Sequence, residues 1–296
     1  MRTETLEEVK KQRALQGKQA GWRPIREALP AAYPTRLIQE ELGALKSGKR
    51  RRKRTRLRRV AEQVKVERKD VIWAQDGAQV GRIEEDPVEA QLIKDRGPLK
   101  HVASWTGPRA DTEDVIALLR WVKEKQGALC LVWQTDNDSS YVSRSTARFL
   151  EQERVIHLKS RVHRPTDNGA AERAVCEMRS MTGLKRDSRL KSYAKTSRKV
   201  EAGIRQLDTY RLRGSRGYVS AEVLAKKMPS WYDAVDRETF YWEARAAMKS
   251  AVAGLAGDRA RKAERDAIHG VLEKYGLITW TRGGGNETQG ALEIIS

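Results

Sequence analysis

Three acidic residues stand in sequence contexts that suit phosphodiester chemistry. Asp136 follows the apolar run Leu129–Trp133, and 35 residues separate it from Glu172, which lies where a predicted turn leads into a helix. Asp76 follows the short run Val71-Ile72-Trp73 about sixty residues upstream. Three carboxylates can bind two divalent cations, and two cations about 3.5–4 Å apart can stabilise both the attacking and the leaving oxygen of a phosphoryl transfer. The residue types therefore predict metal-dependent phosphodiester chemistry.

Each of these acids also has a purely structural interpretation. Asp76 precedes Gly77 and could belong to a turn, and Asp136, within Asp-Asn-Asp, could cap a turn or a helix. Glu172 in the first turn of a helix could complement the helix dipole. The place of Asp136 after a buried strand favours a ligand site, because α/β sheets present their sites at the carboxyl ends of strands.

A large excess of positive charge restricts the partners of this chain. Its 296 residues include 59 Lys and Arg against 40 Asp and Glu, a net charge of +19. Such an excess favours nucleic acid or an anionic membrane surface. No run approaches the roughly 18 apolar residues of a membrane span, and the first residues do not show a signal-peptide pattern, so we do not expect membrane binding. We therefore expect nucleic acid to be the partner of this chain. The protein would then be associated with the nucleoid in the cytoplasm of a bacterium, or located in the nucleus of a eukaryote.

Nucleotide and zinc sites are not predicted. Gly283-Gly284-Gly285 lacks the Lys-Ser or Lys-Thr that follows in a phosphate-binding loop. The four histidines do not have zinc-ligand spacing. Cys130, in an apolar run, and Cys176, on a predicted helix, are both predicted to be small buried apolar residues.

Residues 1–46 are predicted to form an all-α region that resembles a helix-turn-helix. One short helix runs from Pro24 through Leu29, and a second begins at Pro34, so that a four-residue turn joins them. The second helix could enter a DNA groove and present Arg36 and Gln39 to it. A plain helical hairpin is the alternative interpretation.

Residues 47–63 are predicted to be a basic linker. Ten of the fourteen residues from Lys46 to Arg59 are basic, and like charges at this density resist compact packing. We expect Arg50, Arg51, Arg52, Lys53 and Arg54 to contact DNA phosphates, which would make binding depend steeply on salt. The alternatives are a solvated charge run or, in a eukaryote, a nuclear-import signal.

From about Val64 the pattern becomes α/β. Candidate strands are 71–73, 101–105, 129–133 and 155–157. Asp111 is expected to cap a helix that Gly127 ends, a further helix spans about 145–152, and Asn168 is expected to cap the helix of Glu172. Residues 216–296 are predicted to be mainly helical, either a small winged module or a docking or oligomerisation tail.

A further set of residues accompanies the two later acids in a fixed order. It reads Phe149-Leu150-(x5)-Ile156-His157-(x2)-Ser160-(x4)-Pro165-(x2)-Asn168-Gly169-(x2)-Glu172-Arg173. Earlier in the chain stand Asp136-Asn137 with Ser139, and Trp73-Ala74-Gln75-Asp76. These motifs resemble the catalytic core of retroviral-type integrases and bacterial insertion-sequence transposases. The resemblance covers about residues 64–225 and is strongest over 130–180.

The resemblance implies a DNA transposase or integrase. Asp76, Asp136 and Glu172 would be the catalytic, metal-binding carboxylates of an RNase H-like core, a mixed sheet with flanking helices over residues 64–215. It further implies Mg²⁺ or Mn²⁺, two ions per site, double-stranded DNA ends and target as substrates, and a homo-oligomer on DNA. We expect Arg173, Arg179, Lys185 and Arg186 to contact DNA.

Several positions depart from the family pattern. The family's glycine after Asp-Asn is Asp138 here, an acid that could strengthen cation binding or point into solvent. Arg161 and Val162 replace prolines, and His163 replaces an aromatic residue. Two alternative functions remain: a non-catalytic DNA-binding protein built on the same core, and a nuclease or resolvase of the same fold that lacks strand transfer.

Overall fold

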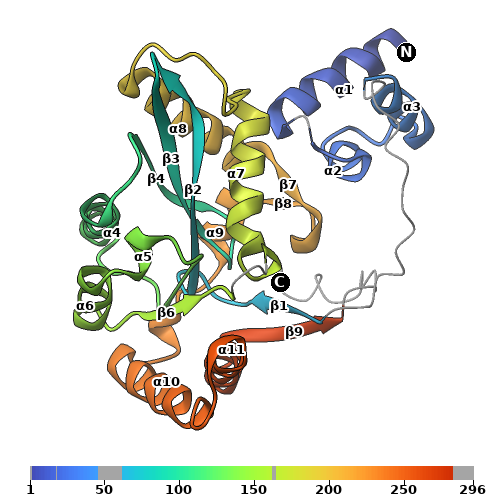
Figure 1. Cartoon of the computed structure of the whole chain (residues 1–296). Helices are drawn as coiled ribbons and strands as arrows, with labels where there is room; N and C mark the ends of the chain where they lie inside the picture. Colours follow the sequence, from blue (N-terminus) through green and yellow to red (C-terminus); the bar gives the residue numbers. More distant parts are fainter. Residues whose placement is uncertain (1, 18, 46–61, 162–164, 283–296) are drawn as a thin grey trace.

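A computed structural model describes residues 2–17, 19–45, 62–161 and 165–282 (Figure 1). Most of the predicted basic linker, including the five residues from Arg50 to Arg54, lies outside these ranges. None of the described helices has the length and apolar content needed to cross a membrane. The domain ranges 1–46, 47–63, 64–215 and 216–296 remain predictions.

The core is a five-stranded mixed sheet. Its strands are β2 (Ile72–Ile83), β3 (Asp86–Asp95), β4 (His101–Gly107), β5 (Val132–Thr135) and β6 (Ile156–Lys159). The order is β4-β3-β2-β5-β6, with β3 antiparallel to both of its neighbours and β2, β5 and β6 parallel. With helices on both faces, this is the predicted RNase H-like architecture.

Helices cover both faces of the sheet. On one face α4 (Thr112–Gln126), α5 (Ser139–Val142) and α6 (Arg144–Gln152) enclose a core around Trp73 and Trp133. On the other, α7 (Gly169–Thr182) and α8 (Tyr193–Tyr210) pack on Val80 and Leu92. As expected, Asp111 caps α4, here with a full capping box, and Gly127 ends that helix in the left-handed conformation.

The N-terminal region is helical, as predicted, and has its own small core. It consists of α1 (Arg2–Gln16), α2 (Trp22–Glu27) and α3 (Thr35–Leu45), packed around Val9, Ile25 and Ile38. The predicted four-residue turn was wrong, because residues 28–34 separate α2 from α3. The Gln206 side chain on α8 donates a 2.9 Å hydrogen bond to a carbonyl oxygen near the end of α1, so this unit packs on the core.

The C-terminal region is mainly helical and packs against the core. The chain passes through β7 (Leu212–Arg213), the 3₁₀ turn Gly214–Arg216, β8 (Val219–Ser220), α9 (Ala221–Lys227), the 3₁₀ turn Trp231–Asp233, α10 (Arg237–Ala251), α11 (Gly257–Lys274) and β9 (Ile278–Arg282). Strand β9 pairs with β1 (Glu62–Val66). Phe240 and Leu272 share one apolar cluster with Ile72 and Val132 of the central sheet. The described part of this region is therefore docked on the core.

Several local predictions need correction. β2 runs on to Ile83, far beyond the predicted strand 71–73, and β3 was not predicted at all. β5 begins at Val132, later than the apolar run suggested. Cys130 is buried as predicted, whereas Cys176 is exposed on the outer side of α7, where its Sγ accepts a hydrogen bond from Gln19.

Candidate active site

Asp76 and Asp136 lie at matching positions of two parallel strands. β2 and β5 are paired in register, and the last pair is Ala74 with Gln134. Each acid lies two residues beyond that pair, and side chains two residues apart on a strand point to the same face. Neighbouring strands are about 4.8 Å apart. Asp76 therefore lies within a strand, not in a turn, beside the carboxyl end of β5.

Two hydrogen bonds hold α7 along β2. They bring Glu172, in the first turn of α7, to the side of Asp76 and Asp136. The Asn168 side chain donates to the carbonyl oxygen of Gln75 at 3.1 Å, and the Arg179 side chain donates to that of Gln79 at 2.7 Å. Figure 1 shows α7 running beside β2. Asn168 occupies the N-cap position but makes no capping hydrogen bond, so the capping role predicted for it was wrong. Its side chain ties the helix to the strand instead.

The three carboxylates interact electrostatically. Burial, together with the neighbouring charges of Asp136, Glu172 and Glu89, raises the pKa of Asp76 to about 7. The backbone N–H of Gly77 opposes this effect. A half-buried carboxyl beside other carboxylates is costly to ionise without a cation. The site therefore concentrates negative charge around Asp76.

Glu89 is an acidic neighbour that the sequence did not reveal. It lies on β3 opposite Gln79 and accepts a short hydrogen bond from Gln91. A Cβ atom at Gly77 would come within 2.5 Å of the Glu89 Oε1 atom, so only glycine fits there without a shift. Recognising β3 as the hairpin partner of β2 would have been enough to find Glu89.

An open hollow of about 480 Å³ adjoins the acids. Its walls include Asp76, Gly77, Ala78, Gln79, Glu172, Val175, Arg179 and Arg186. Arg186 and Gln79 hold each other, since the guanidinium donates to Gln79 Oε1 at 3.1 Å and Gln79 Nε2 donates to the carbonyl oxygen of Arg186 at 3.2 Å. Two arginines thus border the hollow that Asp76 and Glu172 line.

Four further residues predicted to bind DNA lie within the described ranges and on the surface. Arg173 is exposed on α7, and Lys185 is exposed in the segment that follows it. Arg36 and Gln39 are exposed on α3, where Arg36 forms a 3.0 Å ion pair with Glu40. These residues are free of the core, so contact with DNA would not require the fold to open.

The departures from the family pattern have structural roles. Asp138 caps α5 by accepting a hydrogen bond from the backbone of Ser140, and it forms an exposed ion pair with Arg109 at 3.3 Å. It is therefore not simply a residue pointing into solvent. Arg161 forms a two-pronged ion pair with Asp167, at 2.8 and 2.9 Å. Val162 and His163 lie outside the described residues.

A buried ion network anchors α7 from its opposite side. Glu177 is 1% exposed and contacts Lys94 of β3 at 2.9 Å and Arg213 of β7 at 2.7 Å. These cations hold the pKa of the Glu177 carboxyl far below its usual range despite its burial. The network fixes the helix that carries Glu172.

The donor chemistry of the three acids fits a hard divalent cation. All three offer carboxylate oxygens, the ligand type that Mg²⁺ and Mn²⁺ prefer. The raised pKa of Asp76 reflects its burial and the neighbouring negative charge, which a cation would compensate. No three His, Cys, Asp or Glu side chains within the described ranges already form a closed ligand set. Binding would therefore require the carboxylates to draw closer together.

Comparison with known proteins finds similarity in structure only. No family model and no curated protein matches the chain. A simian T-cell lymphotropic virus intasome in complex with PP2A regulatory subunit B56 gamma matches with a TM-score of 0.47 and 12% identity, over 70% of this chain and 71% of that one. The HTLV-2 integrase catalytic core domain in complex with magnesium matches with a TM-score of 0.41 and 11% identity, over 53% and 97%. The BIV integrase catalytic core matches with a TM-score of 0.39 and 13% identity, over 53% and 95%. Similarity at this level carries no argument about activity, and the description of the fold rests on the strand order above.

Proposed function

We propose that this chain is a DNA transposase or integrase, a polynucleotidyl transferase that cleaves DNA ends and joins them to target DNA. The observation that supports it best is the electrostatic contact of Asp76 with Asp136 and Glu172, which come from three separate elements. The arginine-lined hollow beside them would accept a phosphate backbone. The protein would act in the bacterial nucleoid or in the nucleus of a eukaryote.

The three carboxylates would hold two Mg²⁺ or Mn²⁺ ions. When bound, two such ions activate the attacking oxygen and stabilise the leaving one. Arg179, fixed by the carbonyl oxygen of Gln79, and Arg186 would contact the phosphates that flank the reacting bond. Attack by water would free a 3′-hydroxyl at the DNA end, and attack by that hydroxyl would join the end to a target strand. Neither displacement requires a covalent protein intermediate.

The basic surfaces would bind double-stranded DNA, and the N-terminal helices would supply sequence preference through Arg36 and Gln39 on α3. Phosphate contacts position a protein on DNA, whereas contacts with base edges carry the sequence information. Processing two DNA ends together would require at least two copies of the chain, so we expect a homo-oligomer on DNA.

The proposal is tested with duplexes from the DNA that flanks the gene, intact or pre-nicked at the end, incubated with Mg²⁺ or Mn²⁺. We expect Asp76→Asn, Asp136→Asn and Glu172→Gln each to abolish cleavage and joining while DNA affinity stays nearly unchanged. Glu124→Gln is the matched control, because Glu124 is an exposed acid on α4. Near-normal activity in one of the three variants would remove that residue from the proposed triad.

The same assay separates the two alternative functions. Cleavage of intact ends without joining of pre-nicked ends would indicate a nuclease or resolvase of this fold. Binding without either reaction would indicate a non-catalytic DNA-binding protein. The electrostatic interaction of Asp76 with Asp136 and Glu172 favours a catalytic role, since a protein that only binds DNA has no use for clustered negative charge next to its phosphate-binding surface.

A further inference from the structure

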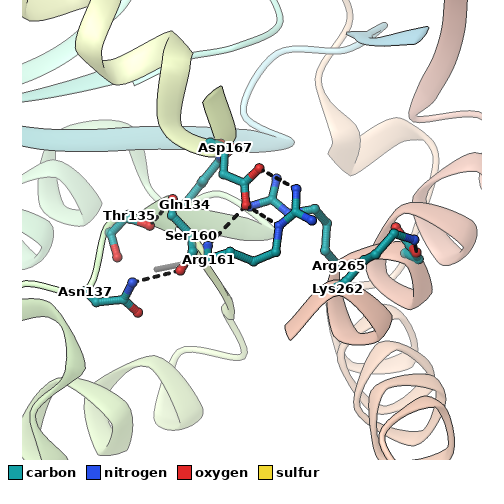
Figure 2. Close-up of polar contacts among 9 residues, drawn as sticks. Gln134, Thr135, Asn137, Ser160, Arg161, Asp167, Lys262 and Arg265 are labelled. Atoms are coloured by element: carbon teal, nitrogen blue, oxygen red, sulfur yellow. Dashed lines mark hydrogen bonds and ion pairs between the residues drawn. The ribbon is translucent and has the colours of Figure 1, made fainter. Parts of the chain in front are cut away.

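A buried carboxylate, Asp167, joins four parts of the chain immediately before Glu172. It lies in the 3₁₀ turn Pro165–Asn168, which leads directly into α7. Its side chain is 6% exposed and pairs with Arg161, from the segment after β6. Its backbone oxygen accepts a short hydrogen bond from Gln134 of β5. Its Oδ2 atom also lies 3.5 Å from Nη2 of Arg265 on α11. We call Gln134, Arg161, Asp167 and Arg265 the Asp167 junction (Figure 2).

The Asp167 junction lies next to all three proposed catalytic acids. Gln134 is two residues before Asp136 on β5. Asn168, which follows Asp167, is hydrogen-bonded to Gln75, the residue before Asp76. Glu172 is five residues beyond Asp167, in the first turn of α7. A displacement of Asp167 would therefore move the start of α7 relative to both strands.

Arg265 is the contribution of the C-terminal region to the Asp167 junction. Its side chain is only 12% exposed, and Asp167 is the acid paired with it among the described residues. Burial and the nearby charge of Arg161 lower the pKa of Arg265, whereas Asp167 opposes that shift. A buried cation of this kind gains from holding its paired anion in place, because loss of Asp167 would leave Arg265 without an ion-pair partner among the described residues.

We propose that Asp167 and Arg265 are positioning residues, through which the C-terminal helix α11 fixes Glu172 relative to Asp76 and Asp136. Arg161 holds Asp167 from within the core, and Arg265 holds it from the docked C-terminal region. The inference rests on the proposed function, in which Glu172 is one of three metal-binding carboxylates. It gives residues 216–296 a role in assembling the active site.

The first test needs no activity. Hydrogen exchange of the backbone amides from Asp167 to Cys176 is compared in the wild type, Asp167→Asn and Arg265→Met. We expect faster exchange in this segment in both variants, with no change in β2 or α4. Lys262→Met is the matched control, because Lys262 lies on the same helix, is 61% exposed and pairs only with Asp266 among the described residues. Unchanged exchange in folded Asp167→Asn and Arg265→Met would overturn the proposal.

The second test measures metal-dependent cleavage. Because a small displacement far from the chemistry can cost up to about 100-fold in rate, we expect kcat to fall on the order of 10- to 100-fold in Arg265→Met, with KM for DNA nearly unchanged. The double variant Asp167→Asn/Arg265→Met should lose no more than the more affected single variant, since Arg265 acts through Asp167. Additive losses would mean that Arg265 acts elsewhere.

The two tests distinguish failure of the proposed function from failure of the positioning role of Asp167 and Arg265. A wild-type protein that cleaves no DNA would refute the proposed function, while the exchange experiment would still decide whether α11 holds the start of α7. If Arg265→Met does not fold, Arg265→Lys keeps the charge but loses the planar guanidinium. In that variant exchange from Asp167 to Cys176 should be intermediate, and wild-type exchange would overturn the role of Arg265.

Discussion

The surroundings of the Asp76 carboxyl oppose its ionisation. Burial and three acidic neighbours raise its pKa to about 7, whereas a structural carboxylate normally has cations or hydrogen-bond donors that lower its pKa, as Glu177 has. Perturbation of this kind, by burial together with specific neighbours, is concentrated at functional sites. At the residue scale, this contrast separates the candidate site from the ion pairs that hold the fold together.

His269 provides a test of the electrostatics beneath the Asp167 junction. It is 5% exposed, and neither ring nitrogen has a hydrogen-bond partner within the described ranges. Burial, with Arg96 and Arg265 nearby, lowers its pKa to about 4 from 6.5. The unfolded chain therefore binds a proton at His269 as the pH falls below 6.5, and the folded chain does so only near pH 4. Its contribution to stability is present above pH 6.5 and is lost between 6.5 and 4.

We therefore expect His269→Leu to flatten the acid side of the stability profile. The wild type should lose roughly 2–3 kcal/mol more than the variant between pH 7 and pH 4. His157, whose pKa burial and Lys159 lower to about 3, acts in the same direction, so part of the slope should remain. Urea denaturation at a series of pH values measures this. Parallel profiles for the two proteins would show that His269 is protonated equally in both states.

Residue identities near the acids were more predictable than their contacts. The motif and the apolar run before it indicate Asp136 and Glu172 as candidates. The bond from Asn168 to the carbonyl oxygen of Gln75, and the pairing of Arg161 with Asp167, could not be predicted. The first joins residues 93 apart in the sequence, and the second spans six residues of an irregular segment, so neither follows from a helix or strand repeat.

At the scale of elements, α7 is held on three sides. Asn168 and Arg179 bond to β2, the Asp167 junction holds its start, and Glu177 lies buried between Lys94 and Arg213. A helix that positions a catalytic acid gains precision from such redundancy. Removing one member of a buried network, however, leaves the others as uncompensated charges.

We predict that Glu177→Gln destabilises the protein by about 3–5 kcal/mol, because it leaves Lys94 and Arg213 buried without their anion. Urea denaturation at pH 7 measures the loss. Glu85→Gln is the control, since Glu85 is 99% exposed and its pair with Arg82 is 3.9 Å long, and such surface pairs contribute about 0–1 kcal/mol. If the two substitutions cost the same, the network around Glu177 does not stabilise the fold.

The strands show where pattern reasoning fails. Strand β3 escaped prediction because the hairpin turn before it contains neither glycine nor asparagine, and Glu84 adopts a positive φ of 52° instead. The continuous apolar run of β5 and the capped helix α4 were predicted, because burial on both faces and capping leave local signals. The docking of α10 and α11 leaves no local signal, since any amphipathic helix could cover that surface.

At the scale of the whole molecule, general affinity for DNA and preference for a particular DNA sequence should depend on different residues. In the proposed function, the net charge of +19 would provide affinity for any DNA, whereas discrimination between sequences needs side chains that reach base edges. Arg36 and Gln39 are exposed on α3, so replacing them should leave the fold intact. The basic residues from Arg50 to Arg54 lie outside the described ranges. Their proposed phosphate contacts are therefore tested by removing their charge and measuring how DNA binding depends on salt.

We predict opposite effects for two variants in a binding titration at several salt concentrations. Replacing Arg50, Arg51, Arg52, Lys53 and Arg54 with glutamine should lower the slope of log affinity against log salt by about 0.9 per lost phosphate contact, while preference for the chain's own DNA ends survives. Arg36→Ala/Gln39→Ala should abolish that preference and change the slope by about one contact at most.

A retained preference in the second variant would place sequence recognition in the core or the C-terminal region. An unchanged slope in the first would mean that the basic run is a solvated linker or an import signal, and that phosphate contacts come from elsewhere on the basic surface.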